Sequence, residues 1–185
     1  CGASLCKWIS EGISITAVVM SCENTIRRKE QENSFKLLGI KDYIISDFKD
    51  GEIPHNKTTI DFLDNIIKSR NINIIFTHSE YDSHQDHNNT MKSAMSAGRN
   101  VNNFFHFDTI PFKRINYQEL SKPTVYSSIT GFLTPKLDSL KCHTSQLYRF
   151  PTHWESILTS EAQYKGTFIS VDYAEAFYCK KLSFM

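Results

Sequence analysis

The sequence has 185 residues and is nearly balanced in charge, with 21 Lys and Arg against 20 Asp and Glu, so it gives no electrostatic case for binding nucleic acid or acidic membranes. Its length suits one domain with a substantial core and is short for two. No apolar run approaches the roughly 18 residues of a membrane span. The five cysteines form no C-x-x-C pair, which favours reduced thiols and a cytoplasmic location.

Strands and helices alternate along the first half of the chain. Short β-branched runs predict strands, while apolar residues at helical spacing predict helices. The predicted order is helix 3–9, strand 13–20, helix 26–38, strand 43–48, helix 59–69 and strand 72–76. This order predicts a mostly parallel sheet with right-handed crossovers. The layout is Rossmann-like, but no G-x-G-x-x-G or P-loop pattern occurs, so nucleotide binding is disfavoured.

The densest group of chemically active side chains comes directly after strand 72–76. It is the segment Thr77-His78-Ser79-Glu80-Tyr81-Asp82-Ser83-His84-Gln85-Asp86-His87. In an open α/β sheet this segment would lie at the carboxyl end of the strand, which is the edge where ligands bind. The alternative is a polar surface loop with three solvated histidines.

A helix is expected to start within this segment. Ser83 followed three residues later by Asp86 is a helix-start signal, and it would bring His84 and His87 together at the helix amino terminus. Neutral imidazole is a common zinc donor, and a neighbouring carboxylate often fixes the orientation of a histidine. One histidine could bind metal while the other handles protons.

The second half of the chain carries weaker functional signals. Arg99 follows this helix, where a cation is favoured in any case, and His143 follows a predicted helix. In helix 26–38, Arg28 and Glu32 are spaced for an i,i+4 pair, so Arg28 is either a surface ion-pair partner or a substrate-positioning residue. The further predicted elements are strands 104–107 and 124–129, helices 133–142 and 154–164, and strands 167–171 and 176–182.

Several motifs together resemble one family, the zinc-dependent N-acetylglucosaminyl deacetylases of the PIG-L or LmbE-like type. The histidine segment is similar to the family pattern T-H-s-x-x-D-x-H-x-D-H. The other matches, in order, are Glu11-Gly12 before a strand, Arg28 and Glu32 before Leu38-Gly39-Ile40, Asp50-Gly51, Lys136 with Ser145-Gln146, and Tyr173-Ala174-Glu175-Ala176-Phe177. Their order and spacing cover almost the whole chain. The resemblance implies a three-layer α/β/α fold.

The family's first metal box, H-P-D-D-E, is not found in the sequence. The resemblance implies that this box supplies a His and an Asp as zinc ligands and a second Asp as the base. We therefore expect residues 1–185 to be a single LmbE-like domain truncated at its amino terminus, with the first strand missing. We expect the function to belong to a longer parent and this chain alone to be inactive.

The resemblance also implies the chemistry. His87 would be the third Zn²⁺ ligand, His84 and Asp86 would be catalytic, and Arg28, Arg99 and His143 would bind substrate. The expected reaction is hydrolysis of the N-acetyl group of an N-acetylglucosamine-type sugar or glycoconjugate. A homo-oligomer stays open. The alternatives are a non-catalytic sugar-binding relative without the metal box, and a structural zinc site built from His78, His84 and His87, with or without Asp82.

Overall fold

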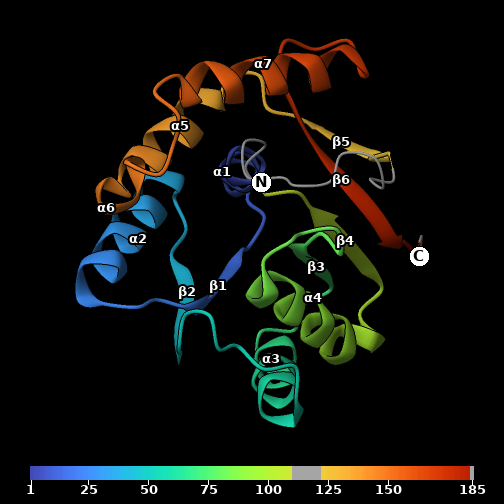
Figure 1. The fold of residues 1–185 in the computed structure, drawn as a ribbon. Coiled ribbons are helices and arrows are strands. Elements are labelled where there is room, and N and C mark those ends of the chain that lie inside the picture. Colours follow the sequence, from blue (N-terminus) through green and yellow to red (C-terminus); the bar gives the residue numbers. More distant parts are fainter. Residues whose placement is uncertain (110–121, 184–185) are drawn as a thin grey trace. The chain divides into compact units, whose positions relative to one another are not determined.

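The computed structural model describes residues 1–109 and 122–183 (Figure 1). The chain divides into two compact units, and each is assembled from two separate stretches of sequence. Unit 1 comprises Cys1–Phe48 and Tyr126–Glu175, and unit 2 comprises Lys49–Val125 and Ala176–Met185. That residues 1–185 form a single domain stays a prediction.

Unit 1 combines a parallel strand pair with helices. Its complete elements are α1 (Gly2–Ser10), β1 (Thr16–Ser21), α2 (Thr25–Leu38), β2 (Asp42–Phe48), α5 (Leu133–Lys141), α6 (Thr144–Leu147) and α7 (Trp154–Thr167). Strands β1 and β2 pair in parallel, with Val18 opposite Ile44. Helix α2 begins where the side chain of Asn24 accepts a hydrogen bond from the backbone N–H of Arg27, and it ends at Gly39, whose φ of 76° closes the last turn.

Two apolar clusters hold unit 1 together. One cluster consists of Ala3, Ile129, Leu133 and Ala162, with Phe132, Leu137 and Tyr173 packed against it. The other consists of Phe35, Leu38 and Ile40, with Leu5, Cys6, Ile9, Ala17 and Val19 packed against it. Residues from α1 occur in both clusters, so burial of this helix joins the strand pair to the α5–α7 region.

Unit 2 carries the histidine segment. Its elements are α3 (Lys57–Ser69), β3 (Ile74–His78), α4 (Gln85–Ala97), the short 3₁₀ helix η1 (Gly98–Asn100) and β4 (Asn103–Phe107). Strand β3 pairs in parallel with β4, which pairs antiparallel with β6 (Ala174–Lys181). The strand order is β3-β4-β6-β5, and the chain crosses between the units within β5 (Val125–Ser128) and within β6. Helices α3 and α4 lie beside one another (Figure 1).

Aromatic packing fixes the part of this sheet that leads to the histidines. The ring of Phe76 stacks on Phe105 at 5.0 Å between ring centroids and meets the edge of Phe177 at the same distance. These three side chains come from β3, β4 and β6, so they hold the three strands in register. The carboxyl end of β3 is therefore a rigid base for the histidine loop.

The predicted mixed α/β fold with mostly parallel pairing is confirmed, with β6 as an antiparallel member. The strands of the described residues form two sheets rather than one. The prediction of a strand at 167–171 is wrong, because α7 continues to Thr167 and a turn comes next, in which Ser170 has a φ of 57°. The β-branched residues there mimic a strand, but Gly166 lies so close to the carbonyl of Val171 that the chain must fold back.

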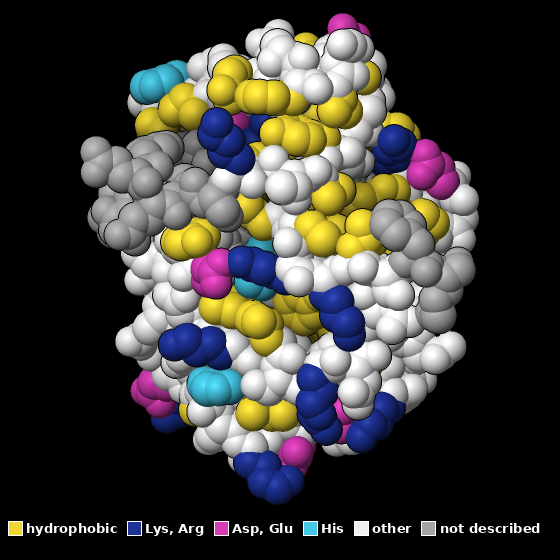
Figure 2. All heavy atoms as spheres, turned by 90° about the vertical axis from the view of Figure 1, so that its right-hand side faces the viewer, with side chains coloured by type: hydrophobic (Ala, Val, Ile, Leu, Met, Phe, Trp, Pro, Cys, Tyr) yellow, Lys and Arg dark blue, Asp and Glu magenta, His cyan; other side chains and the backbone are white. Residues whose placement is uncertain are grey.

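The surface shows mixed charge. The face drawn in Figure 2 carries positive, negative and hydrophobic side chains, with several Lys and Arg side chains close together in its lower part. Among the described residues, no helix has both the length and the apolar character needed to span a bilayer.

Candidate active site

The predicted site loop lies at the carboxyl end of β3, as expected. Strand β3 ends at His78, and α4 begins at Gln85. The helix cap differs from the prediction: the capping residue is His84 and not Ser83, since Nδ1 of His84 accepts a hydrogen bond from the backbone N–H of Asp86 at 3.2 Å. The imidazole does here what a serine hydroxyl usually does.

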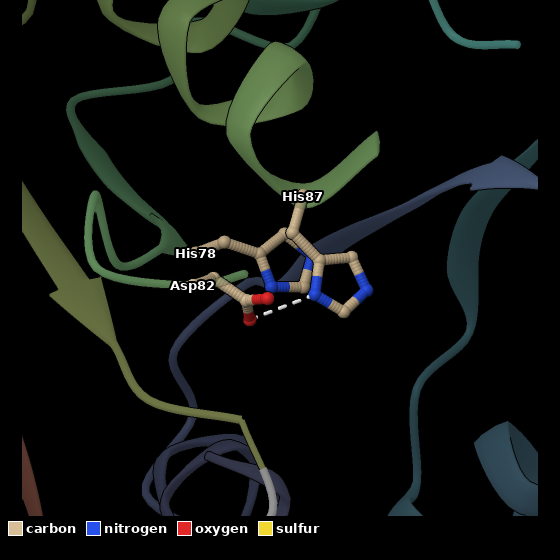
Figure 3. A group of neighbouring side chains, drawn as sticks. All are labelled: His78, Asp82 and His87. Carbon is tan, nitrogen blue, oxygen red and sulfur yellow. Dashed lines mark hydrogen bonds and ion pairs between the residues drawn. The ribbon is translucent and has the colours of Figure 1, made fainter. Parts of the chain in front are cut away.

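Three side chains gather at the mouth of this loop. His78, Asp82 and His87 each offer one possible ligand atom, and these atoms lie within 4.8 Å of one another. Figure 3 shows the carboxylate of Asp82 directed at the two imidazoles. Its Oδ2 lies 2.8 Å from Nδ1 of His87, and the rings of His78 and His87 stack with centroids 4.0 Å apart.

The electrostatics of the cluster define which atoms are available. Burial raises the pKa of Asp82, but hydrogen bonds from His87 and from the backbone N–H of His84 outweigh it and lower the pKa to about 2. The carboxylate is therefore charged at neutral pH, and Nδ1 of His87 donates to it. The lone pair on Nε2 of His87 is then directed away from Asp82 and is available as a ligand.

His78 is the buried member of the cluster. Burial, with a further contribution from His87, lowers the pKa of His78 to about 3, so its ring is neutral. Among the described residues, no group hydrogen-bonds to its buried Nδ1. An unpaired buried imidazole nitrogen is costly unless something occupies the space beside it.

The donor set fits a zinc ion. Two imidazoles and one carboxylate are ligands that Zn²⁺ accepts, and the unpartnered Nδ1 of His78 is an orphaned polar atom at this position. These donors allow two arrangements. Either His78, Asp82 and His87 all bind directly, which requires His87 to release the proton that Nδ1 donates to Asp82, or His87 binds through Nε2 while Asp82 orients it through Nδ1.

The predicted catalytic pair, His84 and Asp86, is arranged differently from expectation. The link between the two residues runs through the backbone N–H of Asp86, whereas its carboxylate accepts hydrogen bonds from the backbone N–H groups of Gly51 and Ile53. The ring of His84 stacks near His87, with centroids 4.7 Å apart. Both histidines are thus at the site, and the catalytic role of the pair stays a prediction.

The three predicted substrate-binding residues belong to different units. Arg99, in unit 2, donates to the backbone carbonyl of Ser96 at the end of α4. Arg28 and His143 belong to unit 1. His143 precedes α6, and burial lowers its pKa. Their roles toward substrate stay predictions.

The proposed Arg28–Glu32 pair is wrong. Arg28 instead pairs with Asp47 at 3.3 Å, and Glu32 lies 3.9 Å from Lys29. The residues of α2 that hydrogen-bond to the Ser145-Gln146 segment lie on a neighbouring face of the helix, at Arg27 and Glu30.

Glu30 and Arg27 tie α2 to the Ser145-Gln146 motif. Glu30 is 6% exposed and accepts hydrogen bonds from the hydroxyl of Thr144 and from both the N–H and the hydroxyl of Ser145. Arg27 donates to Gln146 at 3.2 Å. Sequence reasoning missed these residues and also the orienting role of Asp82. The one sequence signal for the contact between Glu30 and Ser145 was that the α2 motif and the Ser145-Gln146 motif occur in the same chain. A buried carboxylate such as Glu30 needs hydroxyl or amide donors, and Ser145 and Gln146 supply such groups.

Comparison with known proteins agrees with this geometry. The model of the family described as "PIG-L: GlcNAc-PI de-N-acetylase" matches residues 1–98. The uncharacterized deacetylase YaiS of Escherichia coli K12 is 31% identical over 158 residues, which cover 78% of this chain and 83% of the relative. The diacetylchitobiose deacetylase of Thermococcus kodakarensis is 26% identical over 171 residues, covering 83% and 62% respectively.

Solved structures share the fold. The conserved protein TT1542 of Thermus thermophilus matches with a TM-score of 0.85 and 19% identity, covering 100% of this chain and 90% of its own. The hydratase GalB of Pseudomonas putida KT2440 matches with a TM-score of 0.82 and 16% identity, covering 100% and 91%. The zinc-inhibited form of teicoplanin deacetylase Orf2 matches with a TM-score of 0.79 and 15% identity, covering 96% and 91%. From the family model and the identity to YaiS, the chain belongs to the PIG-L family of de-N-acetylases.

Proposed function

We propose that this protein is the core of a zinc-dependent hydrolase that removes the N-acetyl group from an N-acetylglucosamine-type sugar or glycoconjugate. One observation carries the proposal: at the carboxyl end of β3 the charged Asp82 holds Nδ1 of His87, and the ring stacked on His87, that of His78, has a buried Nδ1 with no hydrogen-bond partner among the described residues. The relatives named as deacetylases, including one that acts on diacetylchitobiose, support the substrate class.

The roles of the residues follow from their hydrogen bonds. Zn²⁺, when bound, would supply Lewis acidity and lower the pKa of a water molecule to about 7. His87 would be its ligand, and Asp82 fixes the tautomer of His87. The zinc-inhibited form of Orf2 supports only that a protein of this fold interacts with zinc.

His84 is proposed to act on the substrate. Because its Nδ1 accepts from the backbone N–H of Asp86, neutral His84 carries its proton on Nε2. That N–H can donate a hydrogen bond to the oxygen of the acetamide as negative charge develops. To protonate the leaving nitrogen, His84 would first have to take up a second proton at Nδ1 and release its hydrogen bond from Asp86, so that it acts as the charged imidazolium. The group that takes a proton from water is implied by the family resemblance to lie in the H-P-D-D-E box, and the 185-residue sequence contains no such box.

Substrate contacts and cellular setting are also proposals. Arg28, Arg99 and His143 are proposed to bind the sugar or its substituents. The five cysteines all lie in the described part of the chain and form no disulfide bond, which favours a reducing compartment. We propose a cytoplasmic enzyme that acts on a small amino sugar, with a homo-oligomer as one form.

A second candidate function is a structural metal site that needs no ligands beyond His78, Asp82 and His87. The three donors of His78, Asp82 and His87 lie close enough to hold a metal by themselves, and in a non-catalytic sugar-binding relative such a site would be structural. The fold itself does not decide between these two functions, because the hydratase GalB shares it.

Zinc binding and turnover test the proposal together. We expect the 185-residue chain to bind Zn²⁺ weakly and to show no deacetylation of N-acetylglucosamine, while a form that carries the H-P-D-D-E box should bind Zn²⁺ stoichiometrically and release acetate. In the active form, His87→Ala should lose the metal, and His84→Ala should keep it and lose about 10²- to 10³-fold in rate.

The outcome separates the candidates. Tight, stoichiometric Zn²⁺ binding by the 185-residue chain, with unfolding when a chelator removes the metal, would favour the local structural site. Acetate release that is unaffected by His87→Ala would overturn the proposed function.

A further inference from the structure

Side chains at the start of α4 hydrogen-bond to the backbone of the loop at Gly51–Ile53. All the groups involved belong to unit 2. The carboxylate of Asp86 accepts from the backbone N–H of Gly51 at 2.6 Å and from that of Ile53 at 3.2 Å. Gln85 donates from its side-chain amide to the carbonyl of Gly51, and Asn89 donates to the carbonyl of Ile53 at 2.9 Å. We call these three side chains the clamp.

The clamp leaves no polar backbone group of Gly51 or Ile53 unpaired. Each of these residues has its N–H and its C=O bound by a side chain of α4, as a neighbouring strand would bind them in a sheet. Gly51 has a φ of 81°, a conformation that other residues adopt only with strain, so the turn shape that points its N–H at Asp86 depends on glycine. The loop is thereby fixed to the helix.

The strongest part of the clamp is the carboxylate of Asp86. Asp86 and Ile53 are each 3% exposed, so water does not compete well for the hydrogen bond between them, whereas the bond from Gln85 to Gly51 is exposed. A carboxylate that accepts two backbone N–H groups forms charge-assisted bonds, which are about twice as strong as neutral ones. Further along the same helix, Ser93 contacts His55 at 3.0 Å and extends the attachment.

The three residues of the clamp lie close to the two histidines in the sequence. Gln85 and Asp86 lie between His84 and His87, and Asn89 lies two residues beyond. The first turn of α4 is where both rings are attached, and its backbone is held by Asp82 on one side through the N–H of His84 and by the clamp on the other. Loss of a hydrogen bond in the clamp would therefore move the rings of both His84 and His87.

We propose that Asp86 is a positioning residue: through the clamp it sets the backbone of the first turn of α4, and so the placement of His84 and His87, instead of acting through the imidazole of His84. The proposal rests on the proposed function, in which these two rings serve the reaction. It predicts that the Gly51–Ile53 loop and the two histidines respond to the same substitutions.

The test uses a readout that does not need metal or turnover. In Asp86→Asn the side-chain amide must face a backbone N–H with a donor, so one of the two bonds is lost while side-chain size is kept. Nuclear magnetic resonance would follow the Cε1–H signals of His84 and His87 and the hydrogen exchange of the Gly51 and Ile53 amides. We expect both amides to exchange at least about tenfold faster and both ring signals to shift.

A matched control separates positioning from general loss of stability. Leu63→Ala in α3 removes a buried side chain of the same unit and should lower the melting temperature without shifting the two ring signals. Should Asp86→Asn fail to fold, Asn89→Ala removes only the bond to the carbonyl of Ile53 and is expected to shift the same signals by less. Ring signals that stay unchanged while the loop amides are released would overturn the proposal.

Two further measurements keep the proposal distinct from its premise. In a His84→Ala background, Asp86→Asn should still shift the signal of His87, whereas an Asp86 that acted only through the His84 ring would have no effect there. Addition of Zn²⁺ to a form of the protein that carries the H-P-D-D-E box tests the premise alone: if the His87 signal does not respond there, the proposed function fails while the clamp stands.

Discussion

Glu30→Gln is the substitution for which the structure gives the sharpest expected magnitude. The carboxylate of Glu30 accepts three hydrogen bonds of 2.7 to 2.8 Å from Thr144 and Ser145. A hydrogen bond to a charged group contributes about 1 kcal/mol more than a neutral one. Thr144 is exposed and can bond to water, so the two bonds from Ser145 dominate the expected loss. We expect a loss of about 2 kcal/mol in the free energy of unfolding, or about 4–8 °C in melting temperature for a chain of this size.

The pH dependence of this loss has a defined sign. Burial alone raises the pKa of Glu30, but the hydrogen bonds from Ser145 and Thr144 outweigh it, and the pKa lies below its usual value of 4.5. The folded state therefore binds its proton less readily than the unfolded state. The stabilisation is complete above the unfolded pKa and is lost as the pH falls through the folded pKa. The difference between the two proteins should be smaller at about pH 3 than at about pH 7.

Urea denaturation at both pH values provides the measurement, and Glu32→Gln provides the control. Glu32 is on the same helix and lies 3.9 Å from the well-exposed Lys29, so loss of this contact should cost less than about 0.5 kcal/mol. Equal effects of the two substitutions, or a Glu30→Gln effect that does not shrink in acid, would refute the reasoning.

Three other predictions address the metal site and the packing. In a form that carries the H-P-D-D-E box, Asp82→Asn should weaken Zn²⁺ binding about 10- to 100-fold in calorimetric titration, and unchanged affinity would exclude an orienting role. Gly166→Ala should destabilise by about 1–3 kcal/mol in thermal unfolding, because an added Cβ would collide with the carbonyl oxygen of Val171; Gly2→Ala, with only ordinary contacts, is its control. Burial lowers the pKa of His106 from 6.5 to about 4, so the stability of the native protein should decrease as the pH falls between these values, and His106→Phe should flatten that part of the curve. An identical slope in the variant would contradict this.

The spacing of apolar residues and the residues that start and end helices were enough to predict most helices and strands. Helix α2 was expected at 26–38 and runs from Thr25 to Leu38, because Asn24 and Gly39 are strong end signals that act locally. The end of α7 was missed because its cause is not local. Gly166 approaches the backbone of Val171 and Asp172, and a sequence shows no such contact.

In the candidate site, too, the features set by local sequence could be predicted and those set by distant contacts could not. The position of the histidine loop is determined by the strand before it, and the proximity of His84 and His87 is determined by helical spacing. The partners of Asp86 and Glu30 could not be predicted, because each carboxylate bonds to groups far away along the chain. In α2 the spacing suggested a pair of Arg28 with Glu32, whereas the tertiary contacts are made by Arg27 with Gln146 and by Glu30 with Ser145.

Asp82 imposes a strict limit on how this loop can change in length. Its side chain binds the N–H of His84 two residues later and Nδ1 of His87 five residues later, and its carbonyl accepts from Asn88. An insertion or deletion anywhere between positions 82 and 88 would put at least one of these partners out of reach. Transplanting the segment into another scaffold would therefore require moving residues 82–88 as one indivisible cassette.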